Sequence, residues 1–255
     1  MKNPAAGGGR WVEVPPDRFV SWIVTFAERH GGPAGVALRQ PSAADGTGTA
    51  VTFTAADGAT AECHPPFASA ASLAALFSSP DASQPEPVAP AARPGAGADR
   101  QRAVAEAVAA DACADRTVGV LLVRLGGYAV GVFRGAPPRL VSSKAGSRPV
   151  HGRSAAGGWS QQRFARRREN QAATALRAAA DAADAVFGPY GPGGLDAVVL
   201  GGDKRSAAGL RDDPRLAGYL ARSAGRFLTV PDPRLAVLRE TPRAFLAIRI
   251  RLTEP

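Results

Sequence analysis

The first part of the chain combines a helical pattern with an alternating one. One apolar helix face is marked by residues spaced i, i+3, i+4 and i+7, namely Phe19, Trp22, Ile23 and Phe26. This spacing predicts a helix that starts near Asp17 and ends at the His-Gly-Gly-Pro sequence 30–33. Residues 35–63 alternate between apolar and polar and contain two Asp-Gly turn signals, so they predict two or three short antiparallel strands.

The second half of the chain predicts a mixed sheet with helices. A helix is expected over 101–114 and a long helix over 162–187. Three strand-like runs with Gly-rich turns predict an antiparallel meander over 117–124, 128–134 and 139–143. Strands and helices then alternate, with strands at 195–200, 227–230 and 244–252 and helices at 204–223 and after Pro233. This order predicts an α/β (α+β, mixed-sheet) fold.

Composition divides the chain into three parts. Residues 65–100 are rich in Pro, Ala, Ser and Gly, which is typical of a flexible linker, with room for one short helix near 72–77. We therefore expect an N-terminal helix and short-strand module at 1–64, the linker at 65–100 and the main domain at 101–255.

Several protein classes are excluded by what the sequence lacks. No apolar run approaches the roughly 20 residues of a membrane helix, and the start carries no apolar signal core, so we expect a cytoplasmic protein without membrane contact. The two cysteines, Cys63 and Cys113, are expected to be reduced and structural. Cys63 and His64 are adjacent on a predicted strand and would point to opposite faces, which argues against a catalytic pair. With three histidines and no CxxC or HxxxH, we expect no metal site.

Positive charge is concentrated in one segment. The chain has a net charge of +9. Between 139 and 177 a single acid, Glu169, stands against these basic residues: Arg139, Lys144, Arg148, Arg153, Arg163, Arg166, Arg167, Arg168 and Arg177. The planar guanidinium suits phosphate, and only Trp159 and Phe164 interleave as aromatic residues. This balance favours contact with an RNA backbone or a structured RNA over a solvated basic face.

Familiar catalytic motifs are missing. The chain has no P-loop and no dinucleotide-binding glycine pattern after a strand. The sequence around Ser160 fails the nucleophile-elbow pattern because Gln162 stands where glycine is required. The meander strands carry no clustered carboxylates, which disfavours a metal-dependent nuclease.

The segment 146–171 nevertheless carries a resemblance. It reads GSRPVHGR, then GGWSQQRFARRRENQ from Gly157, and it resembles the actinobacterial release-factor-like peptidyl-tRNA hydrolases, which are relatives of the Vms-type rescue hydrolases. Both groups are similar to the catalytic middle domain of eukaryotic and archaeal class-one release factors, which has an RNase H-like fold. Release factors carry GGQ, whereas the rescue relatives carry GxxQ, as in Gly158 to Gln161. The similarity extends over roughly 117–252.

The resemblance implies a reaction and a set of site residues. Peptidyl-tRNA would be hydrolysed on the ribosome or its large subunit, in translation rescue, by a monomer without metal or organic cofactor. The implied catalytic residues are Gln161, Gly158, Gly157 and Ser160. The implied contacts to tRNA and ribosomal RNA are Lys144, Arg148, Arg153, Trp159, Arg163, Arg166 and Arg167. Glutamine can orient a water molecule without acting as a general base, and the glycines let backbone approach the tRNA end closely.

Two alternative functions stay open on the sequence. A non-enzymatic ribosome- or RNA-binding factor would need only the arginines, and Gln161 would be an ordinary capping or loop residue. A hydrolase acting on free peptidyl-tRNA would be equally active without ribosomes. Every one of these hypotheses predicts RNA binding that weakens steeply with salt.

Overall fold

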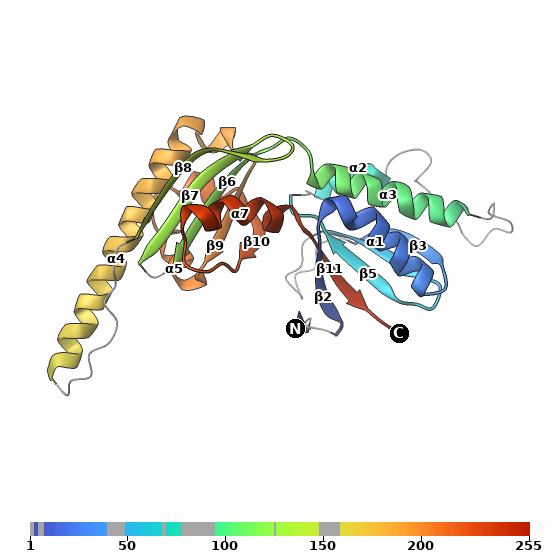
Figure 1. Ribbon diagram of the computed structural model, residues 1–255, viewed down its shortest axis with the longest axis horizontal. Coiled ribbons are helices and arrows are strands. Elements are labelled where there is room, and N and C mark those ends of the chain that lie inside the picture. Colours follow the sequence, from blue (N-terminus) through green and yellow to red (C-terminus); the bar gives the residue numbers. More distant parts are fainter. Residues whose placement is uncertain are drawn as a thin grey trace. The chain divides into compact units, whose positions relative to one another are not determined.

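The computed structural model describes residues 3–4, 8–39, 49–67, 70–77, 95–124, 126–147 and 159–255; of 3–4, 70–71, 76 and 159–171 it describes the backbone alone. The chain divides into two compact units (Figure 1). Unit 1 consists of Met1–Ala114 and Leu246–Pro255, and unit 2 of Asp115–Phe245. Unit 2 is therefore inserted between two parts of unit 1.

Unit 1 is built on a six-stranded sheet with the order β1-β2-β11-β5-β4-β3. Every pair in it is antiparallel. The strands are β1 (Asn3–Pro4), β2 (Arg10–Val14), β3 (Pro33–Arg39), β4 (Ala50–Ala55), β5 (Thr60–His64) and β11 (Ile248–Thr253). The helices are α1 (Pro16–Arg29), α2 (Ala70–Phe77) and α3 (Ala96–Ala112). The predicted N-terminal helix and short strands are present.

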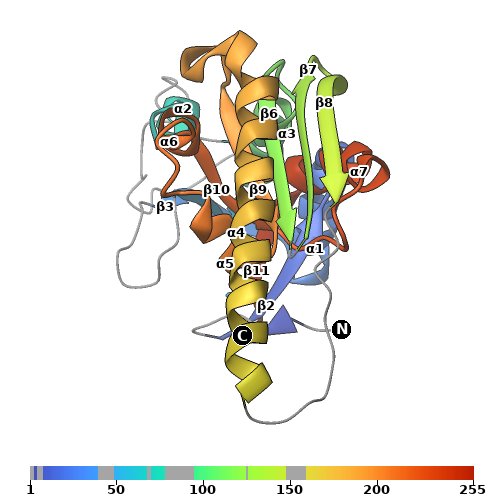
Figure 2. The ribbon, with the colours of Figure 1, turned by 90° about the vertical axis from the view of Figure 1, so that its left-hand side faces the viewer.

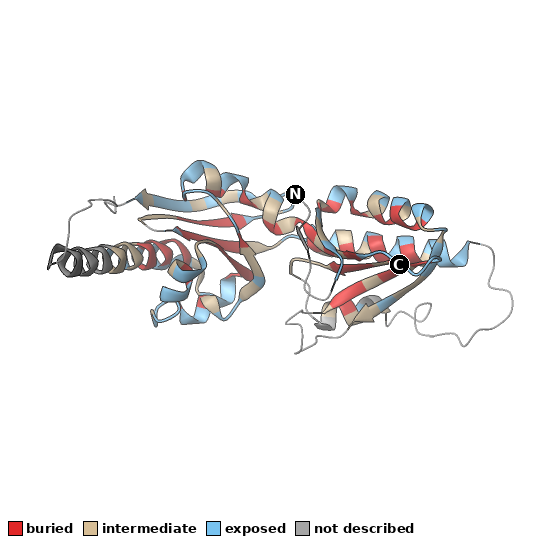
Figure 3. Cartoon of the chain, turned by 90° about the horizontal axis from the view of Figure 1, so that it is seen from below, coloured by how far each residue is buried: buried red, intermediate tan, exposed pale blue. Residues whose placement is uncertain are grey.

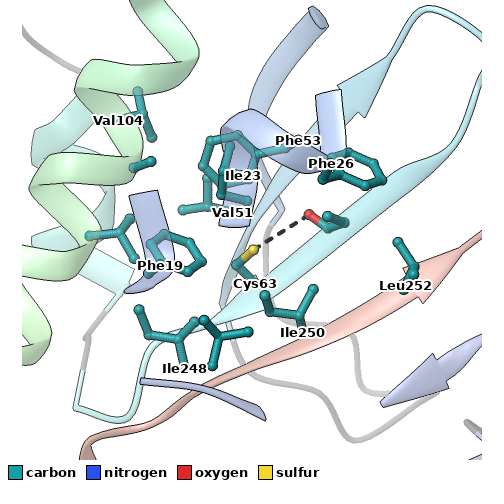
Figure 4. Packing of buried hydrophobic residues seen from close by; sticks show 14 of the residues in the cluster. Phe19, Ile23, Phe26, Val51, Phe53, Cys63, Val104, Ile248, Ile250 and Leu252 are labelled. Carbon is teal, nitrogen blue, oxygen red and sulfur yellow. Dashed lines mark hydrogen bonds between the residues drawn. The ribbon is translucent and has the colours of Figure 1, made fainter. Parts of the chain in front are cut away.

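The core of unit 1 lies between this sheet and its helices (Figure 4). Phe19 and Ile23 of α1 meet Phe53 of β4, with the Phe19 and Phe53 rings 6.2 Å apart and nearly perpendicular. Cys63 is fully buried in this cluster, and burial raises the pKa of its thiol. Cys63 and Cys113 form no disulfide, and Cys113 is exposed.

The opposite face of the sheet is polar. His64 lies there, its ring 5.4 Å from that of Trp11, so it does face away from Cys63 as strand alternation requires. Glu62 is buried on this face and accepts hydrogen bonds from Arg39 (2.8 Å) and from Nε of Arg251 (3.1 Å). His64 Nε2 lies 3.0 Å from the same carboxylate.

The predicted boundaries differ from these units at two places. The helix expected at the start of the main domain is α3, and it packs in unit 1 through Val104 and Val108. The expected closing strand of the main domain is β11, which pairs with β2 and β5. Its buried residues Ile248 and Ile250 complete the core of unit 1. The alternating pattern predicted a half-buried strand correctly, but such a pattern does not specify the partner strand.

Unit 2 contains a five-stranded mixed sheet with the order β10-β9-β6-β7-β8 (Figure 2). The strands are β6 (Thr117–Arg124), β7 (Gly127–Arg134), β8 (Arg139–Ser147), β9 (Ala197–Gly202) and β10 (Ser223–Leu228). β6, β7 and β8 form the predicted antiparallel meander, whereas β9 is parallel to both β6 and β10. The predicted mixed-sheet α/β class is confirmed.

Both faces of this sheet carry helices. Val130 and Val132 of β7 share a buried cluster with residues of α4 (Trp159–Phe187). The alternate residue Phe133 contacts Phe245 of α7 (Leu235–Leu246), with ring centroids 5.6 Å apart. In Figure 3 the buried residues run along the strands of this sheet and the C-terminal part of α4.

The helix predicted over 204–223 is interrupted. It is replaced by α5 (Lys204–Gly209) and α6 (Ala217–Leu220), with turns between them. Gly209 ends α5, and Pro214 cannot continue a helix because it lacks a backbone N–H. Two short 3-10 turns, η1 (Gly188–Tyr190) and η2 (Pro192–Gly194), connect α4 to β9.

Candidate RNA-binding and catalytic site

The predicted catalytic glutamine lies in a helix. α4 begins at Trp159, three residues earlier than the sequence predicted, so Trp159, Ser160 and Gln161 occupy its first turn and not the tip of a loop. No glycine or proline occurs between Trp159 and Phe187, and nothing in that stretch breaks a helix. The backbone N–H groups of a first helical turn have no acceptor within the helix.

The other predicted site residues lie before and after the start of this helix in the sequence. Arg163, Arg166 and Arg167 are in α4, where residues three and four apart share one side of the helix. Lys144 is exposed on the edge strand β8, opposite Val130 of β7. The remaining four, Gly157, Gly158, Arg148 and Arg153, lie outside the described residues.

α4 has two parts with different surroundings. Its C-terminal part buries Ala179, Ala183, Val186 and Phe187 against the sheet. Its N-terminal part runs on past the ends of the strands, as Figures 1 and 2 both show. The predicted site residues on α4 therefore lie beyond one end of the sheet. This is the end at which strand β8 finishes, before the segment 148–158.

The charges of α4 are unevenly distributed along its length. Its first 13 residues contain four arginines and one glutamate, whereas its later part contains Arg177, Asp181 and Asp184. The helix dipole acts on the first turn, residues 159–162, which carries no charge, so the dipole does not determine the energy of these arginines. Arg163 and Arg167 are instead like charges spaced i,i+4, which is unfavourable by about 0.2–0.5 kcal/mol, and a bound polyanion would offset that cost.

An ion pair anchors the packed part of α4. Nη1 of Arg215 lies 2.8 Å from Asp181, and its Nη2 lies 2.7 Å from Asp213. The hydrogen bond from Arg215 lowers the pKa of Asp213, and the two carboxylates raise the pKa of Arg215. This contact joins α4 to the segment between α5 and α6.

The carboxyl end of β9 approaches β6 very closely. Gly202 has φ +103°, and a Cβ at this position would lie 2.1 Å from the carbonyl oxygen of Val123. Only glycine fits such a backbone. The next residue, Asp203, caps α5 by accepting hydrogen bonds from the backbone N–H (2.9 Å) and the hydroxyl (2.7 Å) of Ser206. These bonds lower the pKa of Asp203.

Arg124 at the end of β6 is a residue that sequence reasoning missed. It donates a hydrogen bond to the carbonyl of Val230 (3.3 Å), and its Nε lies 3.9 Å from the carboxylate of Asp232. It thereby holds the segment after β10 at the same end of the sheet as Gly202 and Asp203. The sequence did contain a signal for this role, because Arg124 is the single charged residue of the otherwise largely apolar strand β6 and stands at its end.

Tyr128 and Gly146 form a second close contact at this end of the sheet. They are paired across β7 and β8. A Cβ on Gly146 would lie 2.6 Å from the Tyr128 hydroxyl, so the absence of a side chain makes room for the phenol. Gly146 belongs to the stretch that carried the resemblance, and its role here is to leave room for the Tyr128 ring beside the end of strand β8.

The described residues contain neither a cluster of metal ligands nor a helix that could span a membrane. In this part of the chain, no group of three His, Cys, Asp or Glu residues could hold a metal ion. Among the described helices, none is long and apolar enough to cross a membrane.

Fold and site together define a mixed-sheet α/β protein with a long helix that carries basic residues past its sheet. The family model described as Actinobacteria/chloroflexi VLRF1 release factor matches residues 116–251, which is more than half of the chain. The chain belongs to this release-factor family. The resemblance drawn from residues 146–171 is thereby confirmed, and the protein is release-factor-like with a function connected to translation.

Other comparisons are less extensive. No curated protein matches the chain. Among solved structures, the crystal structure of an archaeal translation termination factor, aRF1, is similar with a TM-score of 0.34 and 14% sequence identity. The similarity covers 48% of this chain and 32% of that one, so this chain spans about a third of the length of that factor.

Proposed function

We propose that this protein is a peptidyl-tRNA hydrolase that releases nascent peptides from tRNA on the ribosome or its large subunit. The supporting observation is that the release-factor family match includes α4, whose first turn contains Gln161 and whose basic part runs past the sheet. A cytoplasmic location and action as a monomer belong to the same proposal.

The proposed reaction is hydrolysis of the ester between the peptide and the terminal ribose of tRNA. The oxygen of a water molecule bonds to the ester carbonyl carbon, the bond from that carbon to the ribose oxygen breaks, and the ribose oxygen takes up a proton from the water. The Gln161 amide orients the water. Free backbone N–H groups in the first turn of α4 stabilise the developing oxyanion.

The remaining predicted residues position the substrate. Gly157 and Gly158 let the backbone approach the tRNA end, and Ser160 lies beside Gln161 in the same turn. The basic residues of the segment and of α4 bind phosphates of tRNA and ribosomal RNA. Water, an amide and backbone donors fill every role, so the proposed reaction uses no metal ion or organic cofactor.

The test is release of labelled peptide from peptidyl-tRNA held on purified large ribosomal subunits. Gln161→Ala should slow release by about a hundredfold, a typical effect of losing one transition-state contact. The matched control is Gln162→Ala, which changes an identical side chain one position along the same helix and should release at the wild-type rate. Binding to the subunit, measured by sedimentation, should be unchanged in both.

Two results would redirect the proposal. Unchanged release in Gln161→Ala would remove this residue from the mechanism. No release by any variant, with binding that requires Arg166 and Arg167, would favour the non-enzymatic binding factor. A parallel assay on free peptidyl-tRNA distinguishes a ribosome-independent hydrolase, which would be equally fast there.

A further inference from the structure

Unit 1 contains a cavity of about 540 Å³ that the proposed function does not use. It lies between one side of α1 and the neighbouring strands β2 and β11. Phe26 and Leu252, which are almost fully buried, form its floor, and Figure 4 shows both at the same end of the core. Arg10 and Val12 of β2 line it from the sheet.

The rim of this cavity is basic. Arg10, Arg18 and Arg29 line it against a single acid, Glu254. Arg10 is 3.6 Å from that carboxylate. For Arg18 and Arg29, both exposed, the described residues supply no ion-pair partner. Two guanidinium groups on one side of α1 are thus available to an anion, and their planar forks match phosphate oxygens.

The wall between these arginines is aromatic. Trp22 is half-exposed and stacks on Phe26 with an interplanar angle of 3° and a centroid distance of 5.8 Å. The Phe26 ring is in turn 5.0 Å from that of His30. His30 is held at the end of α1 by Asp57, 2.7 Å from its Nδ1. The half-exposed indole, backed by a buried ring, is a rigid surface on which a further planar group can stack.

We propose that this cavity binds a nucleotide of a single-stranded RNA segment, with its base against Trp22 and its phosphates at Arg18 and Arg29. Basic side chains that follow a backbone, next to an aromatic ring that stacks a base, are the combination by which proteins hold single strands. The proposal goes beyond the peptidyl-tRNA reaction, because the cavity lies in unit 1 and contains none of the proposed catalytic residues. It gives the protein a second RNA contact, separate from α4.

The observations favour RNA over other anionic partners. The carboxylates of an acidic peptide would pair with the arginines but carry no ring to stack on Trp22, whereas each nucleotide carries both a phosphate and a planar base. A free mononucleotide shares the chemistry of one unit of RNA, and its binding is therefore measured in parallel.

The test is binding of a short fluorescent single-stranded RNA to the full chain, in a background that removes the contribution of α4: Arg163→Gln, Arg166→Gln, Arg167→Gln and Arg168→Gln. In that background, Arg18→Gln with Arg29→Gln should reduce the slope of log affinity against log salt by about 1.4, or about 0.7 per lost phosphate contact. The control pair Arg102→Gln with Arg239→Gln removes the same charge from exposed sites outside the cavity and should leave the slope nearly unchanged.

The aromatic contact is tested separately. Trp22→Leu should weaken binding by about tenfold, the typical effect of losing one stacked base. Trp22→Phe retains an aromatic face and should restore most of the affinity. In the background with the four Arg→Gln changes in α4, RNA should also quench the tryptophan fluorescence of the protein. This quenching should be largely lost when Trp22→Phe is added.

Three outcomes would overturn the proposal. The first is RNA affinity that the cavity variants change no more than the control pair. The second is equal competition by polyglutamate, which would mean that the cavity reads charge alone. The third is tighter binding of a mononucleotide than of the RNA, which would assign the cavity to a free nucleotide.

Discussion

Arg215 lies 2.8 Å from Asp181, and this ion pair joins the packed end of α4 to the segment that follows α5. The same guanidinium makes a two-point contact with Asp213 through Nε and Nη2. One side chain therefore links two carboxylates that are 32 positions apart in the sequence, at the base of the helix that extends past the sheet.

We predict that Arg215→Ala loosens the anchored end of α4 with only a small loss of global stability, since the pair is exposed. Hydrogen exchange of residues 176–187 should become faster, while the rest of the sheet stays protected. The pKa of Asp213, which Arg215 lowers, should rise toward its ordinary value in an NMR titration. Arg211→Ala removes a nearby exposed arginine and should change neither measurement; equal effects of both variants would contradict the anchor.

Gly202→Ala should destabilise unit 2 by about 2 kcal/mol or more. The positive φ alone costs roughly 1–2 kcal/mol for a residue with a Cβ, and the contact with Val123 requires the backbone to shift. Urea denaturation measures the loss. Gly225→Ala on β10 is the matched control because a Cβ there meets no atom within 4 Å. Equal stability of the two variants would show that the close approach of β9 to β6 is unimportant.

Replacing Arg166 and Arg167 by glutamate should lower RNA affinity while α4 stays helical. Arginine and glutamate have similar helix propensities, and the change makes the i,i+4 charge pair between Arg163 and position 167 attractive, so the helical content of α4 should be retained in circular dichroism. RNA binding should fall and become less dependent on salt. Arg177→Glu, further along the same helix, should affect binding much less. A parallel loss of helix and binding would indicate that the arginines are structural.

His64 should make unit 1 less stable in mild acid. Burial lowers the pKa of His64; Glu62 opposes this effect, and Arg249 and Arg39 add to it. The folded state therefore takes up a proton less readily than the unfolded state, and the contribution is fully present above about pH 6.5 and is lost as the pH falls. The protection factors of the β5 and β11 amides, which correct for the slower intrinsic exchange in acid, should fall over this range. His64→Gln should flatten the profile, and an unchanged profile would contradict the assignment.

Local sequence patterns predicted most helices and strands, because the formation of each one depends mainly on the side chains within it. The apolar spacing from Phe19 to Phe26 produced α1, and the Gly-rich turns between 117 and 147 produced the meander of β6, β7 and β8. The strand of Cys63 and His64 placed one residue in the core and the other on the polar face, as alternation requires.

The sequence could not predict long-range relationships. Ile248 and Ile250 indicate a buried face, yet nothing local says that they fill a gap between β2 and β5. The contacts of Arg124 with Val230 and of Arg215 with Asp181 likewise join distant segments by geometry alone. At the site, the sequence placed Gln161 on a loop because the preceding glycines suggested one, whereas helix propensity without a breaker extends α4 back to Trp159.

The place of β11 between β2 and β5 affects how the protein is made. Translation produces β2 and β5 first, then all of unit 2, and only afterwards the strand that joins them. Until then the nascent chain exposes two unpaired strand edges, which are sites for non-native pairing and aggregation. Unit 2 is continuous in sequence and has every strand of its own sheet before β11 is synthesised. It can therefore fold first during synthesis, with unit 1 completed last.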